Sequence, residues 1–333
     1  MAQQPANEDM SDRDTLKAGD AGVRPTWTER TQSTGRREQR PERRVEVVAI
    51  FGPTASGKTA VAEALADRLG TDVVSADAMQ VYRGLPILTN QPSRPTRLVA
   101  IRSLDEQMSL GAFATAAHAE IDELVDANGV AVVSGGTGLY LRAALADLRV
   151  PPRAEPQTRA RIEADVDRDS GSAYDRLRAL DPRSAEHVHP NDRQRLVRAL
   201  ELAEAGESLA AVENRLWSNE TRRPTLIVGL DLPPDLLEER IRARTTEMFA
   251  RGVVREVGAA VAGPISRTAE KTLGLHEVVE LEPAQALERI VVRTRRYAAY
   301  QRKWMRRIPG LVTLDATRPA ADLADDVLAL VRR

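Results

Sequence analysis

The sequence predicts an α/β fold, in which a parallel sheet flanked by helices is interrupted by a helical insertion. Three observations predict it. Short apolar, β-branched runs alternate with helical patterns, as they do in parallel sheets. The first of these runs ends in a glycine-rich loop that leads directly into a helix. Between residues 150 and 223 the strand-like runs cease, and prolines and arginine-rich helical patterns replace them.

Composition places the chain among globular proteins. Of its 333 residues, 42% are hydrophobic and 29% are charged, which is enough apolar material for a buried core. No apolar run approaches the ~18 residues of a membrane span, and the N-terminus lacks the apolar stretch of a signal peptide. We therefore expect a cytoplasmic protein with no membrane partner. The absence of cysteine excludes disulfides, thiolate zinc sites and thiol catalysis. The net charge is −1, so nucleic-acid binding requires a local basic face.

Residues 1–44 are rich in charged and polar side chains and almost lack apolar ones. Such a segment cannot bury enough surface to offset the entropy lost on ordering. We therefore predict a disordered polar tail.

The most informative segment follows the first predicted strand, which spans residues 45–51. It has the pattern Gly-x-x-x-x-Gly-Lys-Thr and consists of Gly52, Pro53, Thr54, Ala55, Ser56, Gly57, Lys58 and Thr59. A strand, this loop and a helix in that order are what a phosphate-binding P-loop requires. Its backbone N–H groups and the helix N-terminus attract phosphate, while Lys58 supplies a charge and Thr59 can hold Mg²⁺. The sequence therefore predicts a P-loop NTPase-like core that binds a di- or triphosphate together with magnesium.

Two further strands are predicted before the insertion, at residues 72–77 and 130–134. The first ends in Asp77, and the second leads through two glycines to Thr137. The carboxyl ends of parallel strands share one edge of the sheet, so both residues are expected beside the P-loop. On the residues alone, Asp77 could be a magnesium ligand, a cap for the next segment or a general base.

The remaining pattern is mostly helical. The 108–128 region and three segments of the insertion (159–166, 173–180 and 194–205) predict helices, and a helix begins at Pro234, a favoured first-turn position for proline. Strands are predicted at residues 225–230 and 311–315, and a final helix at residues 320–331. We therefore divide the chain into a core of residues 45–149 and 224–333 and an insertion of residues 150–223.

Four motifs, taken in order, resemble those of the tRNA dimethylallyltransferases, also called tRNA isopentenyltransferases (the MiaA or IPP transferase family). They are the P-loop, Ser75–Gly84 (SADAMQVYRG), Gly135–Tyr140 (GGTGLY) and His189–Glu201 (HPNDRQRLVRALE). The resemblance runs from about residue 45 to the C-terminus. It implies an enzyme that moves the dimethylallyl group of dimethylallyl diphosphate to N6 of the adenosine 3′ of the anticodon, at tRNA position 37.

The resemblance also implies roles for individual residues. Asp77 is implied as the general base toward the adenosine amine, and Thr137 as a contact to the bridging oxygen of the donor. The diphosphate would occupy the P-loop with Mg²⁺ at Thr59. The implied tRNA contacts are Asp77, Ala78, Met79, Gln80, Arg159, Gln194, Arg195, Leu196, Val197 and Arg198. The expected partners are the anticodon stem-loop of tRNA and dimethylallyl diphosphate, and we expect a monomer.

The residue types suit this chemistry. Positive charge around a diphosphate helps it to leave, and an adenine amine benefits from a carboxylate that takes its proton. Arg195 and Arg198 lie three apart and therefore on one helix face, suited to phosphate contacts. Tyr297, Tyr300 and Trp304 share another face, which we interpret as core. Two alternatives are an adenylate isopentenyltransferase that acts on a free nucleotide and a P-loop small-molecule kinase.

Overall fold

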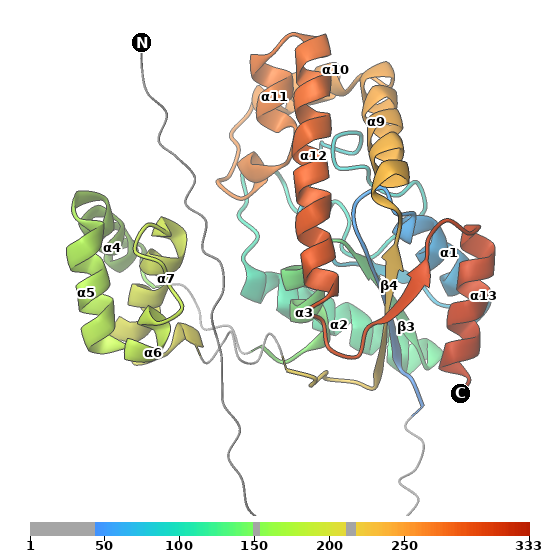
Figure 1. Cartoon of the computed structure of the whole chain (residues 1–333), viewed down its shortest axis with the longest axis horizontal. Coiled ribbons are helices and arrows are strands. Elements are labelled where there is room, and N and C mark those ends of the chain that lie inside the picture. The colour runs from blue at the N-terminus through green and yellow to red at the C-terminus, as the bar shows by residue number, and fades with distance from the viewer. Residues whose placement is uncertain (1–43, 149–153, 211–217) are drawn as a thin grey trace, which may run out of the picture. The chain divides into compact units, whose positions relative to one another are not determined.

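Figure 1 shows a computed structural model of the chain, which describes residues 44–148, 154–210 and 218–333. The predicted tail lies outside the described residues except for Arg44. No helix in these described segments is both long and apolar enough to cross a membrane.

A parallel sheet of five strands forms the core and confirms the predicted α/β class. The strands are β1 (Val47–Phe51), β2 (Val73–Ser75), β3 (Ala131–Gly135), β4 (Thr225–Asp231) and β5 (Val312–Asp315). Their spatial order is β2-β3-β1-β4-β5. Phe51, the last residue of β1, lies opposite Gly135 of β3 and Gly229 of β4. The loops that follow β2, β3 and β1 are consequently neighbours at one edge.

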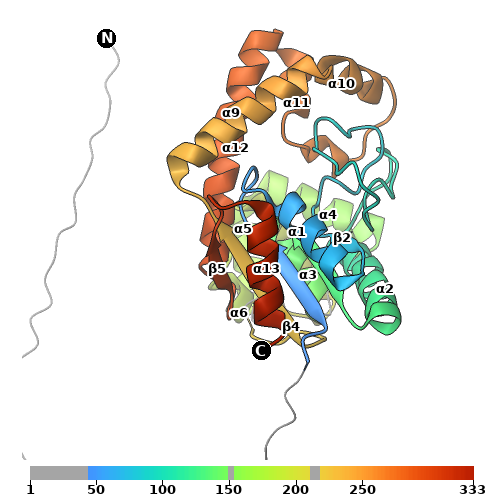
Figure 2. The same ribbon diagram turned by 90° about the vertical axis from the view of Figure 1, so that its right-hand side faces the viewer.

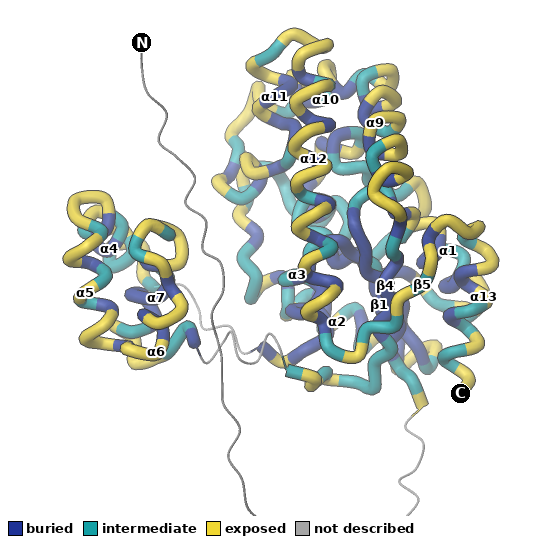
Figure 3. Tube along the Cα trace, viewed as in Figure 1, coloured by how far each residue is buried: buried dark blue, intermediate teal, exposed yellow. Residues whose placement is uncertain are grey.

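Helices cover both faces of the sheet, as parallel sheets require. They are α1 (Lys58–Leu69), α2 (Leu110–Asn128), α3 (Gly138–Leu145) and α13 (Ala320–Val331). Val48 and Ile50 of β1 share a hydrophobic cluster with α1 and α13. The alternate residues Val47, Ala49 and Phe51 belong to a second cluster with α2 and α3. Figure 3 shows β1 and most of β4 as buried and the outer faces of the surrounding helices as exposed.

A further group of helices lies above the sheet in Figure 2. It comprises α9 (Pro234–Ala250), α10 (Val253–Val261), the short 3₁₀ helix η1 (Ala269–Lys271), α11 (Leu275–Glu280) and α12 (Pro283–Met305). Pro234 occupies the first turn of α9, as its restricted φ angle favours. The C-terminal end of α12 packs into the core through Trp304 and Met305. This packing brings α12 against the loop that follows β3.

The described part of the insertion is helical and has a hydrophobic cluster of its own. Its helices are α4 (Pro156–Arg168), α5 (Ser170–Leu180), α6 (Pro182–Ala185) and α7 (Arg193–Glu204). Ile162 of α4, Leu177 of α5 and Leu196 of α7 are fully buried in this cluster. Asp169 caps α5 by accepting the N–H groups of Gly171 and Ser172, which fixes the turn between the first two helices.

Candidate functional site

The P-loop presents unsatisfied polar groups around the start of α1. The Lys58 ammonium folds back and donates to the carbonyl of Pro53 at 2.7 Å. Gly57 adopts φ +92°, a left-handed conformation that glycine tolerates best. The Ser56 hydroxyl is buried and has no hydrogen-bond partner among the described residues. The Thr59 side chain is exposed and, within the same residues, makes no side-chain hydrogen bond. Such groups are what an anion and its metal ion would engage.

Two cations face one carboxylate at this edge of the sheet. Burial lowers the pKa of Lys58 to about 8, while the nearby Asp77 carboxylate acts in the opposite direction. Burial also lowers the pKa of Arg244 on α9, again opposed by Asp77. The Arg244 Nε atom is buried and has no acceptor in the described part of the chain. Lys58 and Arg244 therefore form a partly desolvated positive site, which favours an anionic ligand.

The loop after β2 fixes Asp77 at this site. One carboxylate oxygen accepts the backbone N–H of Met79 at 2.9 Å, which is the geometry of a cap. The carboxylate also influences Lys58, Arg244 and Tyr297 electrostatically, so it faces the same space as those side chains. The cap and a chemical role for Asp77 are therefore compatible.

Thr137 lies at the N-cap of α3, yet its hydroxyl does not cap the helix. It lies 3.0 Å from the hydroxyl of Tyr297 on α12 instead. Gln301, one turn further along α12, accepts the backbone N–H of Thr54 at 2.8 Å and donates to the carbonyl of Gly136 at 2.7 Å. α12 thus connects the P-loop to the loop after β3.

The glycines before and after Thr137 permit this close approach. A Cβ atom at Gly136 would collide with the side-chain nitrogen of Gln301, and one at Gly138 would collide with the ring of Trp304. The Gly-Gly-Thr-Gly sequence therefore lets α12 lie directly against the site.

The three residues after Asp77 are partly buried. The Gln80 amide accepts from the Ser75 hydroxyl at 2.9 Å and donates to the carbonyl of Asn90 at 3.0 Å. The sulfur of Met79 accepts from the hydroxyl of Thr272 at 3.3 Å. The side chains of Met79 and Gln80 thus hold the loop in place, and their contact with tRNA stays a prediction, as does that of Ala78.

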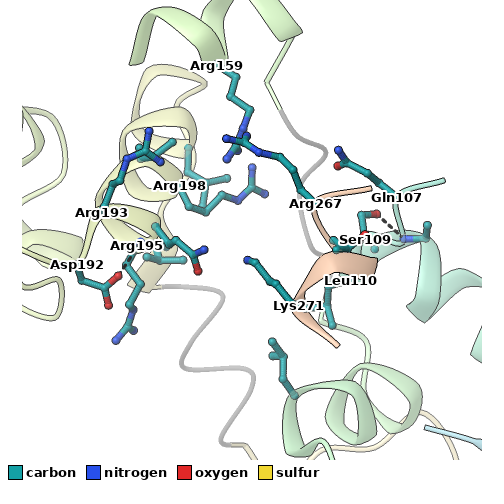
Figure 4. Close-up of a pocket in the computed structure, with 18 of the residues that line it drawn as sticks. Gln107, Ser109, Leu110, Arg159, Asp192, Arg193, Arg195, Arg198, Arg267 and Lys271 are labelled. Carbon is teal, nitrogen blue, oxygen red and sulfur yellow. Dashed lines mark hydrogen bonds between the residues drawn. The ribbon is translucent and has the colours of Figure 1, made fainter. Parts of the chain in front are cut away.

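A pocket with a cavity volume of about 1970 Å³ carries many basic side chains in its lining (Figure 4). It is bordered by α4, α7, the start of α2, residues 267–276 and α12. Its eight basic side chains outnumber three acidic ones, which favours an anionic ligand. The basic residues are Arg159, Arg193, Arg195, Arg198, Arg267, Lys271, Arg293 and Arg307.

Several predicted tRNA contacts lie at this pocket, and their contact with tRNA stays a prediction. Arg159 pairs with Glu163 and Glu201, and Arg198 pairs with the other oxygen of Glu201. Gln194 and Arg195 are exposed on α7. Leu196 and Val197 are almost fully buried in the core of the insertion. Their apolar side chains stabilise α7, and Val197 also belongs to the lining of the pocket.

Sequence reasoning missed three polar residues of the site: Arg244, Tyr297 and Gln301. Helical spacing predicts a core position for Tyr297, but its hydroxyl reaches Thr137. The core interpretation holds for Trp304, which is 9% exposed, and is wrong for Tyr300, which is 54% exposed. Gln301 carried a detectable signal, because it is a polar residue at helical spacing between the buried Ala298 and Met305.

Comparisons with known proteins agree on one family. Residues 80–308 match the family model described as IPP transferase, and residues 45–104 match the one described as Isopentenyl transferase. The chain is 39% identical to the tRNA dimethylallyltransferase of Anaeromyxobacter sp. (strain Fw109-5), over 84% of this chain and 97% of the relative. It is 36% identical to that of Salinispora arenicola (strain CNS-205), over 86% of each chain.

Solved structures extend this similarity to the fold. The full-length tRNA isopentenylpyrophosphate transferase of Bacillus halodurans superposes with a TM-score of 0.62 at 27% identity, covering 86% of this chain and 97% of that one. A eukaryotic dimethylallyltransferase acting on tRNA gives a TM-score of 0.69 at 24% identity, covering 86% and 79%.

Proposed function

The chain belongs to the IPP transferase family, and on this premise we propose that it prenylates N6 of the adenosine at position 37 of tRNA. The relatives that match most of its length are named tRNA dimethylallyltransferase, and they support the same activity for this chain. The observation that carries the finer proposal is the convergence of the P-loop, Lys58, Arg244, Asp77 and Thr137 at one edge of the sheet.

The proposed donor is dimethylallyl diphosphate, with its diphosphate in the P-loop. Backbone N–H groups of Gly52–Thr59 and the N-terminus of α1 would bind its oxygens. Lys58 and Arg244 would supply two positive charges in a partly desolvated site, where charge stabilisation is stronger than in water. The two cations would thereby stabilise the negative charge that develops on the leaving diphosphate.

In the proposed reaction the allylic C–O bond breaks and its electron pair stays on the diphosphate oxygen. The N6 lone pair of adenosine forms the new C–N bond, and Asp77 takes the proton that N6 loses. Thr137 would donate a hydrogen bond to the bridging oxygen as charge builds up there.

Magnesium fits the residues present. Among the described residues there is no cluster of three or more acidic or histidine side chains that could hold a metal ion alone. Mg²⁺ in phosphate sites typically binds one or two protein oxygens and takes its other ligands from phosphate and water. The exposed Thr59 hydroxyl would serve as such a protein oxygen. The ion would neutralise diphosphate charge.

The acceptor is proposed to be the anticodon stem-loop, bound along the basic pocket. Its eight basic side chains suit phosphate contacts, which position a nucleic acid without reading its sequence. A monomeric state and a cytoplasmic location stay predictions from the sequence. The alternative of a free-nucleotide acceptor is not favoured, because the relatives named above act on tRNA.

The decisive assay combines labelled dimethylallyl diphosphate with unmodified tRNA transcripts and identifies the modified nucleoside after digestion. The proposal expects labelled N6-(dimethylallyl)adenosine from position 37 and release of diphosphate, with no transfer to free adenosine monophosphate. A transcript whose position 37 is guanosine is the matched control. Transfer to the free nucleotide alone would contradict the proposal, and so would consumption of ATP without prenyl transfer.

A further inference from the structure

A chain of hydrogen bonds on α12 ends at the Thr137 hydroxyl. The orientation of Gln301 is fixed by its backbone partners, because its oxygen accepts the Thr54 N–H and its nitrogen donates to the Gly136 carbonyl. The side chain of Gln301 also hydrogen-bonds the phenol of Tyr297, which lies one turn earlier on the same helix. Gln301 therefore helps to hold the phenol beside Thr137.

The hydroxyls of Tyr297 and Thr137 lie 3.0 Å apart, and the geometry allows either of them to donate. Burial raises the pKa of the phenol well above its usual range, so it stays protonated at neutral pH and can donate. A Thr137 hydroxyl that gives its own proton to a bound diphosphate must accept here, so in that state Tyr297 donates to Thr137.

This arrangement leaves the Thr137 proton to face the reaction site. A threonine at an N-cap normally accepts a backbone N–H of the first turn, but Thr137 makes no such bond. Its oxygen accepts from Tyr297, and no hydrogen bond to the first turn of α3 fixes the direction of its own O–H. A hydroxyl without such a partner rotates among several orientations, only one of which would serve a leaving group.

We infer that Tyr297, oriented by Gln301, is a positioning residue that turns the O–H of Thr137 toward the leaving oxygen of an allylic diphosphate. This inference rests on the proposed function. The allylic C–O bond breaks with its electron pair on the diphosphate oxygen, and N6 forms the new bond and loses its proton to Asp77. Thr137 keeps its proton and donates only a hydrogen bond to that oxygen.

The test is a double-mutant cycle of Tyr297→Phe and Thr137→Val, read out as single-turnover prenyl transfer at saturating donor and tRNA. Losing one donor to a developing oxyanion typically costs about 10²–10³-fold in rate, and we expect Thr137→Val to approach that range. Tyr297→Phe should lower the rate by roughly 5–30-fold, a part of the same effect. Its donor dissociation constant should stay within a few-fold of the parent value. The double variant should match Thr137→Val alone.

Tyr174→Phe is the matched control. It removes a tyrosine hydroxyl that donates to the Ala185 carbonyl at 2.8 Å within the insertion, and it should leave single-turnover transfer unchanged. A Tyr297→Phe rate equal to that of the parent would overturn the inference. The inference would also be overturned if Tyr297→Phe slowed the Thr137→Val variant by the same factor as it slows the parent protein.

A second variant covers a failure of Tyr297→Phe to fold. Tyr297→Met also removes the phenol hydroxyl and fills the space with a flexible apolar side chain, while it leaves the Gln301 bridge intact. It should slow transfer in the parent but not in Thr137→Val, and equal slowing in both backgrounds would overturn the inference. An inactive parent protein would contradict the proposed function itself, which separates the two failures.

Discussion

Gln301 of α12 accepts a hydrogen bond from the backbone N–H of Thr54 at 2.8 Å, although 247 positions separate the two residues. The other end of the same amide donates to Gly136 at 2.7 Å. One buried side chain therefore holds the P-loop and the loop after β3 at a fixed separation.

The first prediction concerns this bridge. Gln301→Ala leaves the N–H of Thr54 and the carbonyl of Gly136 without their partner, and each unsatisfied buried group costs about 1–3 kcal/mol. We expect the free energy of unfolding to fall by about 2–5 kcal/mol and donor binding to weaken. Urea denaturation and calorimetry measure these effects. Gln285→Ala, at an exposed position of the same helix, is the control, and equal stability of the two variants would contradict the bridge.

The second prediction concerns the charge of Lys58. Burial lowers its pKa to about 8 in the ligand-free protein, so the ammonium is charged below that pH and loses its charge as the pH rises through it. A diphosphate favours the charged form, so donor affinity should be constant just below pH 8 and fall above it. Calorimetry from pH 7.5 to 9.5 measures this. Lys58→Met should bind more weakly and without this dependence, and a pH-independent affinity of the parent would refute the assignment.

The third prediction concerns Arg244. A charge-assisted hydrogen bond contributes about 1.5–3 kcal/mol, so Arg244→Met should weaken donor binding by about 10–100-fold. Arg242→Met is the matched control on the same helix, because Arg242 forms an exposed ion pair with Glu288 and exposed pairs contribute little. Similar donor affinity in both variants would remove Arg244 from the diphosphate site.

The fourth prediction concerns the basic pocket. Replacing Arg195 and Arg198 by alanine should weaken tRNA binding and reduce the salt dependence by roughly one unit of slope per lost phosphate contact. Donor affinity should stay unchanged. Arg178→Ala is the control, since Arg178 lies outside the lining of the pocket and pairs with Asp175 on α5. An unaltered salt slope in the double variant would mean that these arginines do not contact phosphate.

The part of the site that could be predicted is the part encoded locally. The P-loop pattern carries its own strand and helix, and the shared edge of parallel strands places Asp77 and Thr137 beside it without a structure. Pro234 and the final helix at residues 320–331 follow equally from local rules. All of these depend on residues that are close in sequence.

The residues that were missed depend instead on how helices distant in sequence pack against the sheet and the P-loop. Arg244 resembles the other arginines of α9 and differs only in facing the P-loop lysine. Tyr297, Tyr300 and Trp304 share a helical spacing, but α12 meets the core at Trp304 while Tyr300 remains half-exposed. Periodicity identifies a common face, whereas the angle at which a helix leaves the sheet decides which of its residues become buried.

The central claim is that Asp77 takes the N6 proton beside the bound diphosphate. Asp77→Asn isolates this role, because the asparagine oxygen can still accept the Met79 N–H and keep the cap. As a general base, Asp77 should contribute roughly 10²–10⁴-fold to turnover. A magnesium ligand would instead show weakened donor binding that recovers at high magnesium, and a cap alone would show lower thermal stability with turnover retained.

Single-turnover prenyl transfer by Asp77→Asn, at saturating donor and tRNA and across magnesium concentrations, tests this claim most directly. The account predicts a rate reduced by about 10²–10⁴-fold at every magnesium concentration, with donor and tRNA affinities within a few-fold of the parent values. A rate close to that of the parent protein would contradict it.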